Sequence, residues 1–297
     1  MRVVYISGSG RSGSTMLERL LHAGGIGCAL GEFHCLWRLH RSEQTCACGI
    51  PAAEDSFWTR VLARSGLADA ELAELGRLEQ TVVRTGYIAQ HGFNLAELGR
   101  QDDVRRFLDL QFRLFAAIAE QSGREVLIDS SKAGPRAWIL ACHPDVRFLH
   151  LWRDPADVIA SWRSRKFDRG LGSEMQRLSI MRATLDWFKV EWLMRRLARQ
   201  TDVTSLNYRA ICVDPQKELG RALADVGLPM IDDAAWLASH QMVPVKEYHS
   251  LNGNPDRFDR DPISVRLRET DWKILPSLEA LRIRAQGRVL TALYPSP

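Results

Sequence analysis

The sequence predicts an α/β fold, a P-loop-like parallel β-sheet flanked by helices. Short runs typical of buried strands alternate with helix-forming segments, the first run is followed by a glycine-rich loop, and later runs end in charged residues. This alternation is typical of parallel sheets wrapped in helices. Because such sheets bind ligands at the carboxyl ends of their strands, we expect the chemistry in the residues that directly follow the strands.

The first predicted unit is strand, loop and helix. Val3–Ser7 is β-branched and aromatic and is ended by glycines, as expected of a short buried strand. Ser14–Ala23 then has a helical pattern.

Three further strands are predicted. Glu125–Asp129 is followed by a helix around Pro135–Cys142, and Val146–Trp152 is followed by a helix that starts at Asp154–Pro155. An Asp followed by Pro is typical of a helix N-cap and first turn. The fourth strand is predicted at Val203–Leu206.

The rest of the chain is predicted to be mostly helical, within one domain that spans residues 1–297. Residues 54–123 contain no convincing strand and form either a helical insertion that caps the site or a helical flank. A closing helix is predicted at Pro276–Leu293. Within Ser173–Gln200 a stripe at helical spacing is predicted to pack in the core: Leu178, Met181, Leu185, Phe188 and Trp192.

The composition indicates a globular protein with an anionic ligand. The net charge of +4 is too weak to indicate nucleic-acid binding, but 34 of the 40 basic residues are Arg, which forms bidentate contacts with phosphate and sulfonate. The apolar run at the N-terminus is too short for a signal peptide or a membrane span, so we expect a cytoplasmic protein.

Gly8–Thr15 nearly fits the phosphate-loop pattern G-x-x-x-x-G-K-[ST]. Ser14 occupies the Lys position, and no Lys precedes Lys132. Backbone N–H groups and a helix N-terminus can still hold an anion, with Arg11 as the charged group, although a tight structural turn is the simpler alternative.

Gly8–Leu17 together with Trp152–Pro155 (Trp-Arg-Asp-Pro) resembles the family of sulfotransferases that use 3′-phosphoadenosine 5′-phosphosulfate (PAPS). The protein-tyrosine-like and bacterial branches have Arg-Ser-Gly-[Ser/Thr]-Thr where other phosphate loops have Lys. The resemblance implies that PAPS is the cosubstrate and that no metal is required, because a phosphosulfate carries less charge than the ATP phosphates that Mg²⁺ neutralises.

In that family an Arg at a strand end and a Ser eight residues later hold the donor's 3′-phosphate. Arg153 and Ser161 have this spacing, and Arg165 would share a helix face with Ser161. His249–Phe258 resembles a bacterial segment that closes over the donor, where Arg266 and Arg268 would assist. The resemblance therefore assigns these donor-binding residues: Gly10, Arg11, Ser12, Gly13, Ser14, Thr15, Arg153, Ser161, Arg165, Tyr208, Asn254 and Arg257.

Sulfonate transfer to a hydroxyl needs a base and a cation at the leaving oxygen. Glu32 follows Arg11 by 21 residues, as the catalytic Glu does in the protein-tyrosine-like branch. His34 is the alternative base, and a helix-capping or salt-bridged Glu is the alternative role for Glu32. Lys132 lies where similar enzymes place the cation, shared with Arg11, although it could also be a solvated loop residue.

Several points stay open at this stage. A phosphoryl-transfer kinase and a non-catalytic nucleotide-binding protein are the alternative functions. The acceptor (a small molecule, carbohydrate or peptide) and the oligomeric state are undetermined. Cys46 and Cys48 are either structural, a redox pair or half of a zinc site, for which Cys28, Cys35 or His34 could complete the ligands; bacterial relatives tend to carry a third Cys where this chain has Ser56.

Overall fold

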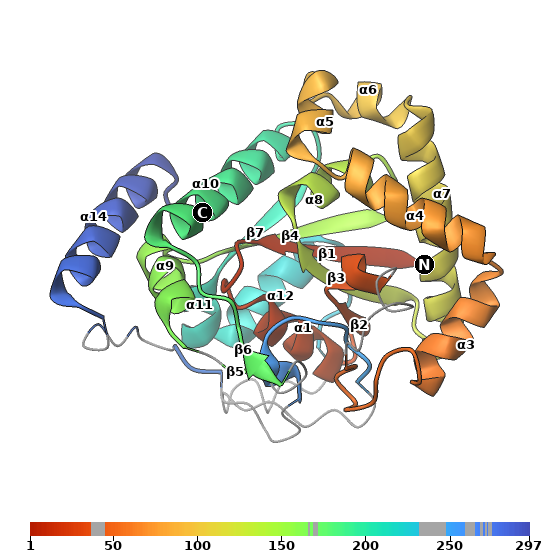
Figure 1. Cartoon of the computed structure of the whole chain (residues 1–297), viewed down its shortest axis with the longest axis horizontal. Coiled ribbons are helices and arrows are strands. Elements are labelled where there is room, and N and C mark those ends of the chain that lie inside the picture. Colours follow the sequence, from red (N-terminus) through yellow and green to blue (C-terminus); the bar gives the residue numbers. More distant parts are fainter. Residues whose placement is uncertain are drawn as a thin grey trace.

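A five-stranded parallel sheet forms the centre of the molecule, which confirms the predicted α/β class (Figure 1). The computed structural model describes the chain except residues 37–44, 166, 169–171, 232–247, 259–264, 268–269, 271 and 273–274, so Arg268 lies outside the described residues. The strands lie in the order β2 (Cys28–Gly31), β3 (Val126–Lys132), β1 (Arg2–Gly8), β4 (Val146–Trp152) and β7 (Val203–Asn207).

Both faces of the sheet are apolar, because alternate residues of each strand enter different cores. Val4 and Ile6 pack with helices α1 (Ser14–Ala23), α11 (Tyr208–Val213) and α12 (Pro215–Asp225). Val3 and Tyr5 face the opposite core, with α8 (Gly134–Leu140) and α10 (Ile180–Leu197). Continuous apolar strands of this kind are typical of parallel sheets covered on both faces.

Residues 54–123 are helical, as predicted, and flank the sheet. The long helix α7 (Asp102–Ser122) packs against β3, and α3 (Ser56–Ser65) and α4 (Asp69–Val82) pack on α7. Two short helices complete the segment: α5 (Thr85–Gln90) and α6 (Leu95–Gly99). None of these residues lines the cleft described below, so their contribution to an acceptor pocket stays a prediction.

The predicted core stripe of α10 was wrong for Met181 and Leu185, whereas Leu178, Phe188 and Trp192 are half-buried and pack against the core as predicted. Met181 and Leu185 are 60% and 49% exposed, whereas Ala183, Trp187 and Met194 are buried. Helix α10 begins only after its N-cap Ser179, later than the predicted segment Ser173–Gln200. Ser173–Glu174 forms strand β6, which pairs with β5 (Phe167–Asp168).

Helix α9 (Pro155–Arg163) begins as predicted, because the Asp154 side chain accepts hydrogen bonds from the Ala156 and Asp157 N–H groups at 2.8 and 3.4 Å. The closing helix is α14 (Ser277–Leu293), and short 3₁₀ turns lie at η1 (Phe33–Cys35) and η2 (Pro255–Phe258). Within the described residues, no helix has the length and apolarity needed to cross a membrane.

Candidate active site

The candidate site lies at the carboxyl edge of the sheet, where every strand delivers a residue that the sequence singled out. β1 is the central strand and leads into the glycine-rich loop, with β3 and β4 on either side of it. The residues delivered by the other four strands are Glu32 after β2, Lys132 at the end of β3, Arg153 after β4 and Tyr208 after β7. Residues far apart in sequence therefore meet because their strands are parallel.

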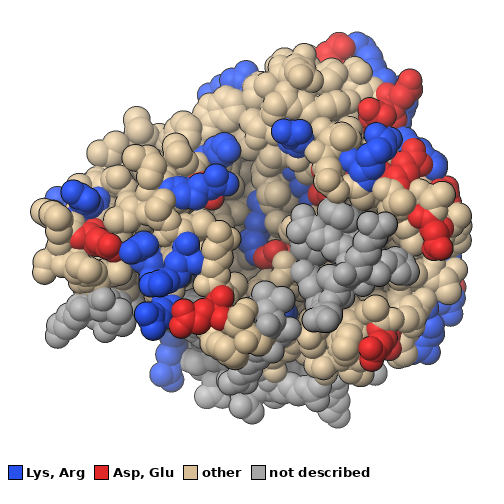
Figure 2. Space-filling view, viewed as in Figure 1, with Lys and Arg blue, Asp and Glu red and all other residues tan. Residues whose placement is uncertain are grey.

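These residues line a cleft of about 460 Å³. Figure 2 shows a hollow in the middle of the drawn face, with basic side chains on its walls. The predicted residues that line the cleft are Gly10, Arg11, Gly13, Ser14, Thr15, Glu32, Lys132, Arg153, Ser161, Tyr208 and Asn254. Ser12, His34, Arg165 and Arg257 are not among the lining residues.

The glycine-rich loop is shaped by two close contacts with aromatic rings. A Cβ on Gly13 would lie 2.6 Å from the Tyr208 ring, and a Cβ on Gly10 would lie 2.5 Å from Trp162. Gly13 also has a φ of 103°, which side chains rarely adopt. Gly10 is therefore required by packing, and Gly13 by both packing and the turn.

Arg11 is held in the loop with its charge beside the cleft. Its backbone φ of 71° is in the left-handed region, its guanidinium lies 4.9 Å from the centre of the Trp162 ring, and Nη2 donates to Met175 Sδ at 3.2 Å. By contrast, the Ser12 side chain is fully buried beneath the loop. Its predicted contact with the donor therefore stays a prediction.

Lys132 is directed by an irregularity in the sheet. The register of β1 and β3 shifts between Tyr5 and Ser7, so that Ser7 pairs with Lys132, and Lys132 has a φ of 68°. Bulges of this kind re-aim side chains next to active sites. The Lys132 ammonium forms an ion pair with Glu32, and both side chains are 17% exposed.

Glu32 is positioned by residues 248–258, a segment more than 200 residues later in the sequence that we call the strap. The Glu32 N–H donates to Leu251 O at 2.7 Å, and Asn252 Nδ2 donates to Glu32 Oε2 at 3.0 Å. Burial raises the pKa of Glu32, but the Lys132 ammonium, the His34 ring and the Arg257 guanidinium outweigh it and lower the pKa below its ordinary value. Glu32 is therefore a carboxylate at neutral pH.

His34 is held behind this pair. Its backbone N–H donates to Ser131 Oγ at 3.1 Å, and Ser131 in turn bonds to the buried carboxylate of Asp129. Burial lowers the pKa of His34 to about 4, so the ring is neutral at pH 7. Because it does not line the cleft, its geometry favours Glu32 as the proton acceptor.

Arg153 bridges the loop and the sheet edge. Its Nη1 donates to Arg11 O at 2.9 Å, and its guanidinium lies 4.4 Å from the centre of the Tyr208 ring. Ser161 lines the same cleft. The predicted shared helix face of Ser161 and Arg165 was wrong: α9 ends at Arg163, and the Arg165 side chain is 73% exposed and lies 4.0 Å from Glu174.

The strap is fastened to α1. Asn254 N–H donates to Thr15 Oγ1 at 3.4 Å, and Arg19 Nη1 donates to Asp256 O at 2.6 Å. Arg257 is buried and donates from Nη1 to Gly253 O at 2.9 Å, so it stabilises the strap itself. This segment therefore contacts Thr15 and Arg19 at one end of the cleft and lies beside Glu32.

Arg266 also lines the cleft, as do Asn252, Gly253 and Asp256 of the predicted donor-closing segment His249–Phe258. The lining residues that sequence reasoning missed are Met16, Arg19, Trp162, Glu174, Met175 and Gln176. Trp162 could have been found, since it directly follows the predicted donor-binding residue Ser161 on α9. The residues of the β5–β6 region carry no local signal, because a two-residue strand has no measurable periodicity.

Comparison with known proteins identifies the class. A family model described as "Sulfotransferase family" matches residues 4–233. The sulfotransferase domain from the curacin biosynthetic pathway is similar in structure, with a TM-score of 0.50 and 16% identity, covering 100% of this chain and 98% of that one. A comparison with curated proteins found no match.

Two further solved structures are similar. The sulfotransferase domain of the Synechococcus PCC 7002 olefin synthase has 20% identity and a TM-score of 0.46, covering 99% of this chain and 95% of that one. A Mycobacterium avium sulfotransferase has 16% identity and a TM-score of 0.47, covering 100% and 77%. The chain belongs to the sulfotransferase family, which makes it a transferase of sulfonyl groups.

Proposed function

We propose that the chain transfers a sulfonate from PAPS to a hydroxyl of an acceptor. The observation that carries the proposal is the Glu32–Lys132 ion pair, which lines the same cleft as the glycine-rich loop and Arg153. A carboxylate that can take a proton and a cation that can stabilise a leaving oxygen are the two groups that the reaction requires.

The donor would lie along the cleft with two anionic groups held separately. The loop offers backbone N–H groups at the N-terminus of α1 to the 5′-phosphate, with Arg11 beside it. Arg153 and Ser161 offer a guanidinium and a hydroxyl to the 3′-phosphate. A second phosphate site of this kind would distinguish this donor from a nucleotide that has no 3′-phosphate.

The reaction would be a direct displacement. The acceptor oxygen forms a bond to sulfur while the bond from sulfur to the bridging oxygen breaks, and 3′-phosphoadenosine 5′-phosphate leaves with the bridging electrons. Glu32 takes the acceptor's proton, and Lys132 stabilises the negative charge on the leaving oxygen. No covalent bond to the protein is formed.

Donor specificity is tested first by thermal shift. We expect stabilisation by 3′-phosphoadenosine 5′-phosphate and none by ATP with Mg²⁺; stabilisation by ATP with Mg²⁺ alone would refute the donor assignment.

Turnover is then measured with ³⁵S-labelled PAPS over a panel of hydroxyl acceptors that includes phenols, carbohydrates and tyrosine peptides. Glu32→Gln should lower turnover by about 10²- to 10⁴-fold while nucleotide binding persists. Full turnover by this variant would remove Glu32 from the mechanism.

A further inference from the structure

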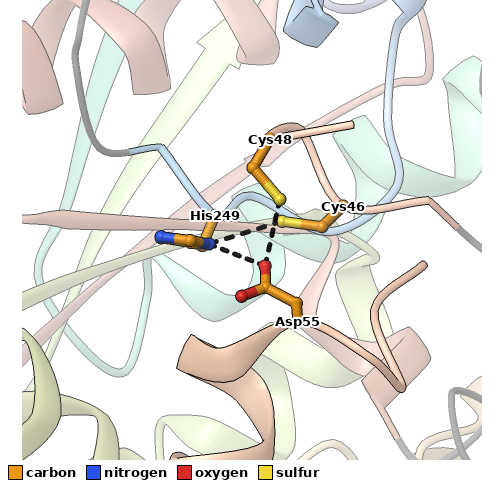
Figure 3. Close-up of side chains that lie close together, drawn as sticks. All are labelled: Cys46, Cys48, Asp55 and His249. Atoms are coloured by element: carbon orange, nitrogen blue, oxygen red, sulfur yellow. Dashed lines mark hydrogen bonds and ion pairs between the residues drawn. The ribbon is translucent and has the colours of Figure 1, made fainter. Parts of the chain in front are cut away.

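Four potential metal ligands converge outside the cleft: Cys46, Cys48, Asp55 and His249 (Figure 3). Their ligand atoms all lie within 4.8 Å of one another. Cys46 Sγ lies 3.7 Å from His249 Nδ1, Cys48 Sγ lies 3.1 Å from Asp55 Oδ2, and His249 Nδ1 lies 2.7 Å from the same oxygen. Bonds of about 2.0–2.3 Å to a tetrahedral zinc ion place neighbouring ligands roughly 3.3–3.8 Å apart, so small shifts would close the set on one ion.

Local structure brings the two thiols together. Cys46 N–H donates to Ile50 O at 2.8 Å, and Gly49 N–H donates back to Cys46 O at 2.8 Å. Gly49 has a φ of 94°, which permits this tight turn. The turn therefore directs the Cys46 and Cys48 side chains into the cluster.

Asp55 and His249 are also fixed by contacts outside the cluster. Asp55 is the N-cap of α3, where Oδ1 accepts from Phe57 N–H at 2.8 Å, which leaves Oδ2 for the cluster. The His249 ring stacks on the Phe57 ring, with centres 4.6 Å apart and planes 7° apart, and Trp58 Nε1 donates to His249 O at 3.0 Å. The ligand geometry is thus set by the surrounding fold.

The arrangement is that of a ligand set rather than of a nucleophile with its base. A Cys–His–Asp relay uses both ring nitrogens, one toward sulfur and the other toward the carboxylate. Here the same atom, His249 Nδ1, faces both Cys46 and Asp55, and Figure 3 shows the other ring nitrogen pointing away. Cys46 is also fully buried, out of reach of a substrate.

We propose that Cys46, Cys48, Asp55 and His249 bind a structural zinc ion. Two thiolates, an imidazole and a carboxylate suit zinc, and four protein ligands leave no open position for catalysis. The partners of the cysteine pair are then Asp55 and His249, not the Cys28 or His34 considered from the sequence; the Cys35 side chain lies outside the described residues.

The site would fasten the strap. His249 belongs to the strap, three residues before Asn252, which contacts Glu32, and Ala47 N–H donates to Ser250 O at 3.0 Å. An ion held between the strap and the turn at Cys46 would therefore restrain the segment that contacts Thr15 and Glu32. None of the four ligands lines the cleft, so the ion would take no direct part in the proposed transfer.

The experiment measures metal content by mass spectrometry on the full chain purified without chelator. We expect one zinc ion per chain, and its loss in Cys48→Ser and His249→Phe, the latter of which retains a ring to stack on Phe57. Asp55→Asn retains a capping side chain and should weaken zinc binding about 10- to 100-fold. Cys142→Ser, a half-buried cysteine elsewhere, should keep full zinc content.

The same samples are heated with and without EDTA. EDTA should lower the unfolding temperature of the unsubstituted chain and of Cys142→Ser, but not that of His249→Phe. A chain that takes up no zinc after incubation with the ion, or one whose zinc content is unchanged in the cluster variants, would overturn the proposal. So would a Cys46–Cys48 disulfide in the freshly purified protein.

Discussion

Glu18→Gln should remove a large part of the pH dependence of stability. Glu18 is buried on α1, where Oε1 accepts from Gly31 N–H at 2.9 Å and from the Tyr248 hydroxyl at 3.3 Å, and Oε2 accepts from Ser130. Burial raises its pKa to about 7, against the hydrogen bonds from Ser130, Ser250 and Gly31, which lower it. This carboxyl therefore holds a proton in the folded chain at pH values where the unfolded chain has lost it.

The sign and size follow from linkage. Because the folded pKa is raised, the stabilisation is fully present below the unfolded pKa, 4.5, and is lost as the pH rises through about 7. A shift of roughly 2.5 units corresponds to about 3 kcal/mol in total, of which about 2 kcal/mol falls between pH 5.5 and 8.5. Glutamine cannot ionise, so the variant lacks this component.

The assay is urea denaturation at pH 5.5, 7.0 and 8.5 for both proteins. The free energy of unfolding of Glu18→Gln relative to the unsubstituted chain should increase by about 2 kcal/mol over this range. Glu54→Gln, at an exposed position, is the matched control and should show no such trend. A pH-independent difference for Glu18→Gln would refute the reasoning.

Three other substitutions test the site and its support. Arg136→Met leaves the buried Asp129 without its ion-pair partner and should lower the free energy of unfolding by about 3–5 kcal/mol in urea denaturation; an unchanged midpoint would contradict this. Gly13→Ala places a methyl group against the Tyr208 ring at a positive φ. It should lower the free energy of unfolding by about 1–3 kcal/mol and weaken nucleotide binding measured by calorimetry. Gly86→Ala, which has open space around the added methyl group, should change neither quantity. Arg153→Ala should weaken the binding of 3′-phosphoadenosine 5′-phosphate about 10- to 100-fold and leave the binding of adenosine 5′-phosphate unchanged. Equal losses of affinity for the two nucleotides would remove Arg153 from the 3′-phosphate site.

Local motifs made part of the site predictable from the sequence. The glycine-rich loop, the N-cap at Asp154 and the spacing of Arg153 and Ser161 lie within short stretches whose residues specify a strand end and a helix start. Their meeting at one edge followed from parallel strands. Arg165 was misplaced because nothing in its neighbours signals that α9 ends two residues earlier.

The rest depends on contacts between distant segments. The strap reaches Glu32 across 220 residues, and His249 meets Asp55 across 194. The bulge that turns Lys132 toward the cleft arises from pairing with β1, not from the sequence of β3 itself. Periodicity and turn propensity describe neighbours along the chain, so they carry no information about such contacts.

The Glu32–Lys132 ion pair raises a question about the proposed mechanism, since a carboxylate of lowered pKa is a weak base. The causes of that lowered pKa indicate an answer: burial raises it, and the Lys132 ammonium is the largest influence that lowers it. A sulfonate bound beside Lys132 would compete for the ammonium, while Glu32 would keep its partly buried position beside the strap. Its pKa would then rise, so the donor itself would make Glu32 a better proton acceptor. The base would thus be activated only when there is a sulfonate to transfer.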